Sequence, residues 1–553
     1  MGATFHPRPT QIATARKSRQ ARTPGKLVLC TLAAAVLSLG PGQAAAAAVP
    51  LQEPPIPKLV PVAVTARTLT AQTIARDVKT LQQLLSQHPG DGQVRGPDQL
   101  VYQLDVTLAP DVHEFAAHES VHVHNNLGRP ISTLYFNVWP DAPHYRQAGG
   151  YEQVKGVTVD GKPAHFTLHG TLLTVQLNHP LPAGGEGVVA MDLLAKLPHI
   201  QDRYGWNGTN IDLGNWFPIL AVHDEHGWVT PPYYNDGESF YSLTGAFHLR
   251  ITAPKTWVLA VTGQETGVQE HPQAGTVTYD YTAVGVRDVA VVADSTYKVL
   301  QGRAGNTAIY VYYTPSEKAL CTTMLNVAKQ ALAAYNQWYG PYPYPTLRVC
   351  GMVGWFGGME YPQLVMISFY PGADSASDIT ADVAHEVAHQ WFYGLVGDDQ
   401  YLTPWIDEAF ATLSEQRFDH ADISATDPEP AGNHVSYPVS AFGNSDFGGG
   451  NAADAYYTTI YNMGARTLYD LMQAMGEPAF DRMLQQYVQR YMYQVATTED
   501  FMQFVSQAAG KDMTAFFQQH LVFAHDSDQA PEQPWVALEE AENQRPWSGE
   551  DGP

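Results

Sequence analysis

The sequence contains few cysteines, and this limits the covalent bonds that can stabilise the fold. Only three cysteines occur among its 553 residues, so a framework of several disulfide bonds is excluded. Cys30 lies in an apolar N-terminal segment. The other two, Cys321 and Cys350, could form one disulfide in an oxidising compartment or remain as two buried thiols.

Positive charge is also scarce. The chain has 31 Lys and Arg against 55 Asp and Glu, which gives a formal net charge of -24. Six of the cations lie within the first 50 residues, where no acid occurs, so the remainder of the chain is still more acidic. A protein with this charge is not expected to follow a polyanion, and we therefore expect no nucleic acid partner.

No apolar run reaches the roughly 20 residues that a membrane-spanning helix requires. Residues 27–40 (LVLCTLAAAVLSLG) are apolar, follow the basic stretch and precede Pro41, Gly42 and five alanines. This order predicts a signal peptide over residues 1–48, cleaved after Ala46 or Ala48. We thus expect a secreted or periplasmic protein whose mature chain has no stable membrane span. An uncleaved signal that anchors the protein in a membrane is the alternative.

The hydrophobic pattern of the sequence divides the rest of the chain into four segments. Residues 49–98 combine a proline-rich leader with a short helix within residues 67–87, and residues 99–300 alternate polar and apolar residues in runs typical of β-strands. Residues 301–523 follow a helical period, and residues 524–553 form an acidic, proline-containing tail that we expect to be disordered. The sequence therefore predicts an α+β multidomain protein.

Within residues 301–523 the pattern predicts one strand, Thr346–Val353, and several helices. The predicted helices are Pro315–Tyr339, Asp378–Tyr393, Pro404–Phe418, Thr459–Met475, Pro478–Tyr491, Thr498–Ala509 and Thr514–Leu521.

A metal-binding pattern lies in the segment HEVAH. His385 and His389 are one helical turn apart, so both imidazoles can reach a single Zn²⁺ ion. Nineteen residues after His389, Glu408 lies in a segment where Thr403 can cap and Pro404 can open a second helix. Two His and one Glu leave a coordination position for water, as in a catalytic zinc site.

Glu386 then lies beside the metal, where it can take a proton from water and pass it to a leaving amine. Peptide hydrolysis is the reaction that suits this arrangement. Asp407 and Asp382 flank the site, and we expect them to cap helices or to support the metal ligands.

Four segments resemble the M1 family of zinc aminopeptidases, gluzincins of the aminopeptidase N and leukotriene A4 hydrolase type. These segments are GGMEYP (Gly357–Pro362), AHEVAHQWFYGLVGDD (Ala384–Asp399), PWIDEAFA (Pro404–Ala411) and IYNMGARTL (Ile460–Leu468). The resemblance spans roughly residues 100–523. It implies an N-terminal β-sandwich-like, saddle-shaped domain followed by a thermolysin-like, mainly α catalytic domain with one zinc ion per chain.

The resemblance also implies roles for a substrate-binding segment, Gly357, Gly358, Met359 and Glu360. In this family the glutamate of the matching segment binds the substrate's free α-ammonium group, which assigns Glu360 to that role. The two glycines would let the substrate backbone approach closely. Tyr361 stands where many members have Asn, and we expect it to change the local support of the segment.

Two further roles follow from the family. The tyrosine that stabilises the transition state matches Tyr461, although Tyr456 and Tyr457 lie nearby in the sequence. A second ammonium-binding side chain is expected from the β domain, near Gly214–Glu225.

The resemblance predicts a secreted aminopeptidase that acts on peptides with a free N-terminus. A thermolysin-like endopeptidase would share the metal ligands, and an inactive M1-like peptide-binding protein would share the fold. Because only about 30 residues follow Phe523, we expect a short two-domain, bacterial-type form whose more open cleft admits longer peptides.

Overall fold

The computed structural model describes residues 64, 66–90, 95–234, 237–354, 357–370, 374–425, 435–440 and 455–521. The predicted signal peptide and acidic tail lie outside the described residues, so both remain predictions. Within the described ranges, no helix is both long enough and apolar enough to cross a membrane.

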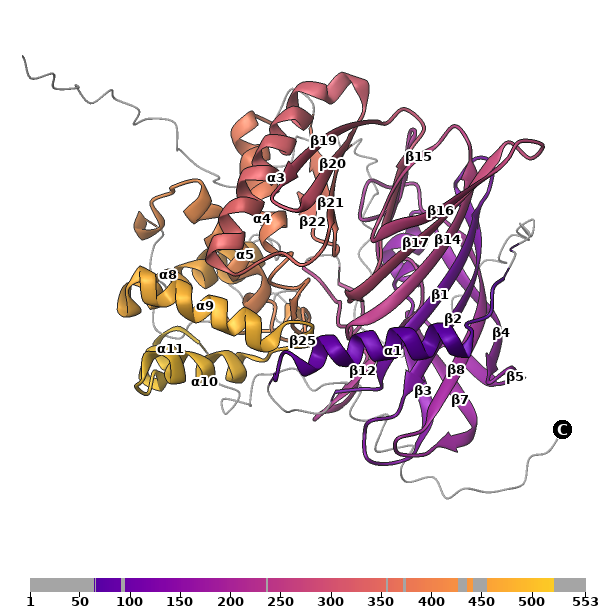
Figure 1. The fold of residues 1–553 in the computed structure, drawn as a ribbon, viewed down its shortest axis with the longest axis horizontal. Coiled ribbons are helices and arrows are strands. Elements are labelled where there is room, and N and C mark those ends of the chain that lie inside the picture. The colour runs from indigo at the N-terminus through magenta and orange to yellow at the C-terminus, as the bar shows by residue number, and fades with distance from the viewer. Residues whose placement is uncertain are drawn as a thin grey trace, which may run out of the picture. The chain divides into compact units, whose positions relative to one another are not determined.

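The first half of the described chain is built around an eight-stranded sheet with the order β16-β17-β14-β1-β2-β8-β4-β5 (Figure 1). Neighbouring strands are antiparallel except β1 and β14, which run parallel. The strands are β1 (Asp98–Leu108), β2 (Glu114–His124), β4 (Tyr151–Val159), β5 (Lys162–Pro163), β8 (Glu186–Lys196), β14 (Gly245–Pro254), β16 (Gln264–His271) and β17 (Thr276–Val286).

The alternation in the sequence decides which face of this sheet is buried. On β8, Val189, Met191 and Leu193 point into the main core, while the residues between them are partly exposed. Helix α1 (Ala71–Ser86), within the segment predicted to be helical, packs on β1, β14 and β17 and buries Leu81 against Val101 of β1.

Two four-stranded sheets and a hairpin complete this β-rich half, with strand orders β15-β18-β10-β9, β11-β3-β7-β6 and β12-β13. Their strands are β3 (Ile131–Asn137), β6 (His165–His169), β7 (Leu172–Leu181), β9 (Tyr204–Asn207), β10 (Asn210–Leu213), β11 (Ile219–Leu220), β12 (Val222–Asp224), β13 (Gly227–Val229), β15 (Val258–Val261) and β18 (Val291–Asp294). A 3-10 turn, η1 (Trp139–Asp141), and helix α2 (Pro143–Gln147) follow β3.

The second half combines a five-stranded sheet, ordered β19-β20-β21-β23-β22, with helices (Figure 1). The strands are β19 (Lys298–Ala304), β20 (Thr307–Tyr313), β21 (Thr346–Val353), β22 (Gly358–Met359) and β23 (Leu364–Phe369). Strands β20, β21 and β23 run parallel, and every residue of β23 is buried, as expected for a strand covered on both faces.

The helices of this half surround the metal-binding pattern, with α4 packed against both α3 and α5. They are η2 (Pro315–Glu317), α3 (Lys318–Trp338), α4 (Ala376–Ala388), α5 (Trp405–Phe418), η3 (Ile423–Ala425), the π-helix η4 (Tyr457–Met463), α8 (Gly464–Met475), α9 (Glu477–Tyr491), α10 (Thr498–Ala509) and α11 (Thr514–His520). A short parallel pair joins β24 (Val396–Gly397) to β25 (Gln494–Val495).

A β-rich half followed by a helical half confirms the α+β multidomain fold, while several boundaries differ from the sequence predictions. Helix α4 starts at Ala376 because Ser375 and Asp378 form a capping box. The segment Thr459–Met475, predicted as one helix, is divided between η4 and α8. The predicted capping role of Thr403 is wrong, since its hydroxyl donates to the Asp399 carbonyl instead.

The two cysteines of the described chain are free thiols. Cys321 lies in α3 and Cys350 in β21, and both are buried. Burial raises the pKa of the Cys321 thiol to about 12, so it is inert at neutral pH. Of the two alternatives left open by the sequence, the structure therefore supports two buried thiols.

Candidate metal centre

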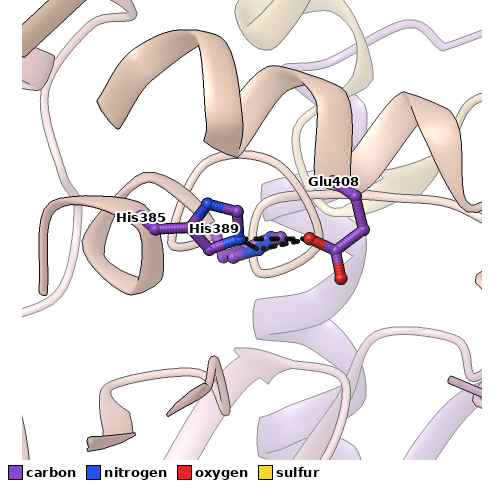
Figure 2. Close-up of side chains that lie close together, drawn as sticks. All are labelled: His385, His389 and Glu408. Atoms are coloured by element: carbon purple, nitrogen blue, oxygen red, sulfur yellow. Dashed lines mark hydrogen bonds and ion pairs between the residues drawn. The ribbon is translucent and has the colours of Figure 1, made fainter. Parts of the chain in front are cut away.

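Helices α4 and α5 bring three potential metal ligands together. His385 lies in the last turn of α4, His389 is the residue that ends it, and Glu408 lies in the first turn of α5. The Nε2 atoms of the two imidazoles are 3.0 Å apart, and they lie 3.1 and 3.3 Å from Oε2 of Glu408 (Figure 2). Ligand atoms of a tetrahedral zinc site are about 3.3–3.4 Å apart for bonds of 2.0–2.1 Å. The donor set and its spacing therefore fit zinc.

Carboxylates hold the far side of each imidazole. Nδ1 of His389 lies 2.5 Å from Oδ1 of Asp407, and Nδ1 of His385 lies 3.6 Å from Oε2 of Glu415. Such partners fix the ring orientation and leave Nε2 for the metal. The predicted supporting position of Asp407 is therefore confirmed. Glu415 was not predicted, although it lies two turns after Glu408 on α5 and so on the same helix face.

The charge state of Glu408 suits a metal ligand. Burial alone would raise its pKa, but the imidazoles of His389 and His385 outweigh burial and hold the pKa of Glu408 well below its usual range. A second group of potential ligand atoms comes from Glu360, His389 and Asp407. There the Nδ1 atom of His389 already bonds Asp407, so we assign the metal to the first group.

Glu386 lies buried beside this centre, and burial raises its pKa well above the usual range. Its Oε2 atom has no hydrogen-bond partner among the described residues. A carboxyl group whose pKa is raised by burial binds a proton more readily than an exposed one, as a proton-transfer residue must. The predicted proton-transfer residue thus has both the position and the environment for that step.

Gly357 and Gly358, which precede Glu360, are explained by different features of the structure. A Cβ atom on Gly358 would lie 2.1 Å from Oε1 of Glu386, so this glycine makes room for the Glu386 carboxyl group. Gly357 has a φ angle of +81° and open space around it, which agrees with the expected room for a substrate. The Met359 side chain is buried in the core, so only its backbone could meet a substrate.

Tyr461 reaches the metal centre from the π-helix η4. Its hydroxyl donates to Oε1 of Glu408 over 2.5 Å, and its ring stacks on His385 at a centroid distance of 5.7 Å. Burial raises the pKa of Tyr461 well above the usual range, so the phenol keeps its proton and remains a donor. The rings of the neighbouring Tyr456 and Tyr457 pack against Tyr461, at 5.9 and 4.9 Å.

A pair of carboxylates faces the metal centre. Glu360 accepts a hydrogen bond of 2.9 Å from Nε2 of Gln400, and the same nitrogen donates to Glu238. Both glutamates are buried, and Nη1 of Arg203 lies 3.4 Å from Oε1 of Glu238. Burial and the charge of Glu360 raise the pKa of Glu238 well above its usual range. This pair would be stabilised by a small cation.

Glu238 is the site residue that sequence reasoning missed. A second ammonium-binding side chain was expected near Gly214–Glu225, and Glu238 lies beyond that segment, in a stretch without a recognisable motif. The expected segment instead supplies Asn215, whose Oδ1 accepts a 2.8 Å hydrogen bond from the Tyr361 hydroxyl. Tyr361 therefore joins the Glu360 segment to the β-rich half, which is the local support expected of it.

The segments that form the metal centre lie in a region that matches a known protein family. Residues 323–520 match the Peptidase family M1 domain. Aminopeptidase M1-A of Oryza sativa subsp. japonica is 22% identical over 443 residues, covering 74% of this chain and 48% of that protein. Puromycin-sensitive aminopeptidase of Caenorhabditis elegans is 25% identical over 247 residues, covering 40% of this chain and 25% of that protein. The chain thus spans about half or less of the length of these relatives.

Solved structures share the fold over nearly their whole length. An M1 zinc metallopeptidase from Deinococcus radiodurans has a TM-score of 0.56 and 18% identity, covering 78% of this chain and 95% of that one. A mutant two-domain M1 zinc metallopeptidase bound to L-arginine has a TM-score of 0.54 and 17% identity, covering 81% of this chain and 97% of that one.

Proposed function

We propose that this chain, a member of peptidase family M1, is a zinc aminopeptidase that removes N-terminal residues from peptides. The observation that carries the proposal is the buried pair Glu238 and Glu360 beside the metal ligands. Arg203 supplies one cation to this pair, at 3.4 Å from Glu238, and a second cation would balance the other carboxylate. The α-ammonium group is the cation that every unblocked peptide offers at its first residue. Fixing that group next to the metal confines cleavage to the first peptide bond.

His385, His389 and Glu408 would hold the zinc ion, which when bound supplies a Lewis acid that activates water and polarises the substrate carbonyl. Glu386 takes a proton from the attacking water and delivers it to the leaving amine. The Tyr461 hydroxyl, which donates to Glu408 in this structure, would turn its proton to the oxyanion that develops on the substrate. Glu360 and Glu238 hold the α-ammonium group during these steps.

A paired substrate comparison tests this function. The zinc-loaded protein should hydrolyse an aminoacyl p-nitroanilide and leave its N-acetylated twin intact, because acetylation removes the positive charge. Chelation should abolish hydrolysis, zinc should restore it, and Glu386→Gln should lower kcat by about 10²–10⁴-fold. Equal cleavage of both twins would favour an endopeptidase, and a zinc-loaded protein without hydrolytic activity would favour a peptide-binding protein.

We also propose that the protein is secreted or periplasmic. The apolar run at residues 27–40, its basic flank and the following alanines support export. N-terminal sequencing of the mature protein should find a start at Ala47 or Val49, and an intact N-terminus in the membrane fraction would instead support anchoring.

A further inference from the structure

We infer that Gln400 is a positioning residue that holds the two ammonium-binding carboxylates and links them to the carboxylate behind His389. The inference rests on the proposed function, because it concerns how the same site recognises an α-ammonium group. It extends that function to a residue outside the four matched segments of the sequence.

Three carboxylates converge on one amide nitrogen. Nε2 of Gln400 lies 2.9 Å from Oε1 of Glu360 and 2.7 Å from Oδ2 of Asp407, and Oε2 of Glu238 is a third close acceptor, so three carboxylates share its two N–H groups. All four side chains are buried, and Gln400 is only 1% exposed. These acceptors come from three separate stretches of the chain, so Gln400 is the point at which those stretches meet.

The backbone around Gln400 is fixed as firmly as its side chain. Its N–H group donates to the Phe240 carbonyl over 3.2 Å, two residues after Glu238. The carboxylate of the preceding residue, Asp399, accepts the N–H groups of Tyr401 and Leu402 at 3.1 and 2.9 Å. This turn leads directly into α5 and allows the amide little freedom to move away from the carboxylates.

Asp407 extends the contact to the metal centre. Its Oδ2 atom accepts from Gln400, and its Oδ1 atom lies 2.5 Å from Nδ1 of His389. A continuous hydrogen-bonded chain therefore runs from Glu360 through Gln400 and Asp407 to a metal ligand. Removing the Gln400 side chain would therefore free both Glu360 and Asp407 from this hydrogen-bonded network.

A neutral amide suits this position better than a charged or an apolar side chain. An apolar residue would remove the one donor that these three buried carboxylates share. A lysine would neutralise them and so repel the substrate's ammonium group. Gln400 provides N–H groups without adding a positive charge that would compete with the ammonium group of the ligand.

Binding to the metal-free protein tests the inference without relying on catalysis. Calorimetry would compare L-leucinamide and L-argininamide with their Nα-acetylated twins. The wild type should prefer the free amines, Gln400→Leu should weaken their binding at least about tenfold, and its zinc affinity should fall about 10–100-fold. Gln400→Lys should also lose the preference for free amines while keeping zinc affinity within about threefold of wild type, because its ammonium group still donates to Asp407.

Gln103→Leu is a matched control, because Gln103 is also buried and donates to a carboxylate, Asp105, at 2.8 Å in β1. This variant should bind amines and zinc as the wild type does. The inference is overturned if Gln400→Leu behaves like the control, or, should that variant not fold, if Gln400→Lys keeps the preference for free amines. A wild type without that preference would instead overturn the proposed aminopeptidase function.

Discussion

At the scale of single residues, Gly358 lacks a side chain because the Glu386 side chain occupies the space, and not because its backbone conformation requires glycine. A new Cβ atom would meet the far end of the flexible Glu386 side chain, so the fold can yield at small cost while the carboxyl group moves. We expect Gly358→Ala to lower kcat by about 10²-fold or more, with zinc content and melting temperature close to wild type.

Gly357→Ala provides the contrast. Gly357 has a left-handed φ of +81°, and no atom of the described residues lies near the added Cβ, so this variant should lose about 1–2 kcal/mol of stability. If Gly358→Ala kept the wild-type kcat, the close approach of Glu386 to this glycine would not matter for proton transfer.

Glu119 in β2 gives a prediction about pH. Both of its carboxyl oxygens are buried without a hydrogen-bond partner among the described residues, and burial raises its pKa well above the usual range. A raised folded-state pKa favours folding at low pH, and this contribution is lost as the pH rises above the unfolded value of about 4.3 and through the folded one.

Glu119→Gln should therefore raise the free energy of unfolding by about 1–3 kcal/mol at pH 8 and change it little at pH 4. Urea unfolding at the two pH values measures this difference. Glu265→Gln, on the exposed strand β16, should show no such pH-dependent gain. If Glu119→Gln were less stable than the wild type at pH 8, the Glu119 carboxylate would have to make a stabilising contact that the amide cannot replace.

At the scale of elements, the turn that follows α4 supports the loop that carries Glu360 through Gln390, the residue after His389. Nε2 of Gln390 donates to the carbonyls of Glu360 and Tyr361, both at 3.2 Å, and its Oε1 accepts the N–H group of Gln363 at 2.8 Å. The loop that carries Glu360 is thus fastened to the end of the helix that carries the histidines.

Replacing Gln390 with alanine should release this loop. We expect KM for aminoacyl substrates to rise about tenfold or more and kcat to fall less, since the zinc ligands are not touched. Steady-state kinetics and zinc analysis measure the two effects. A lower kcat with an unchanged KM would show that Gln390 supports the metal side of the site and not the Glu360 loop.

The features that the sequence predicts best are those formed by residues close together in the chain. The spacing of His385 and His389 follows from helix geometry, and the structure brings them together with Glu408 of the next helix. Glu238 could not be predicted, because it meets Glu360 only through tertiary folding and lies in no periodic pattern. Thr403 is a residue type that often caps helices, but its hydroxyl donates a hydrogen bond to the nearby Asp399 carbonyl instead.

At the scale of the whole molecule, Arg287 joins segments from both halves of the chain. It follows β17, is almost fully buried, and donates to the carbonyls of Tyr393 at 2.7 Å, Ser242 at 3.0 Å and Gln494. Burial lowers the pKa of Arg287, yet an arginine remains charged at neutral pH. One guanidinium therefore supplies hydrogen bonds to carbonyl groups of three separate segments.

Arg287→Met should cost about 3–5 kcal/mol, because it leaves several buried carbonyl groups without donors. It should also separate the unfolding of the β-rich half from that of the helical half, since the side chain contacts both. Calorimetric unfolding should then show two transitions where the wild type shows one. Arg303→Met, at an exposed position in β19, should stay within about 0.5 kcal/mol of wild type. A single wild-type-like transition for Arg287→Met would show that other contacts suffice to join the two halves.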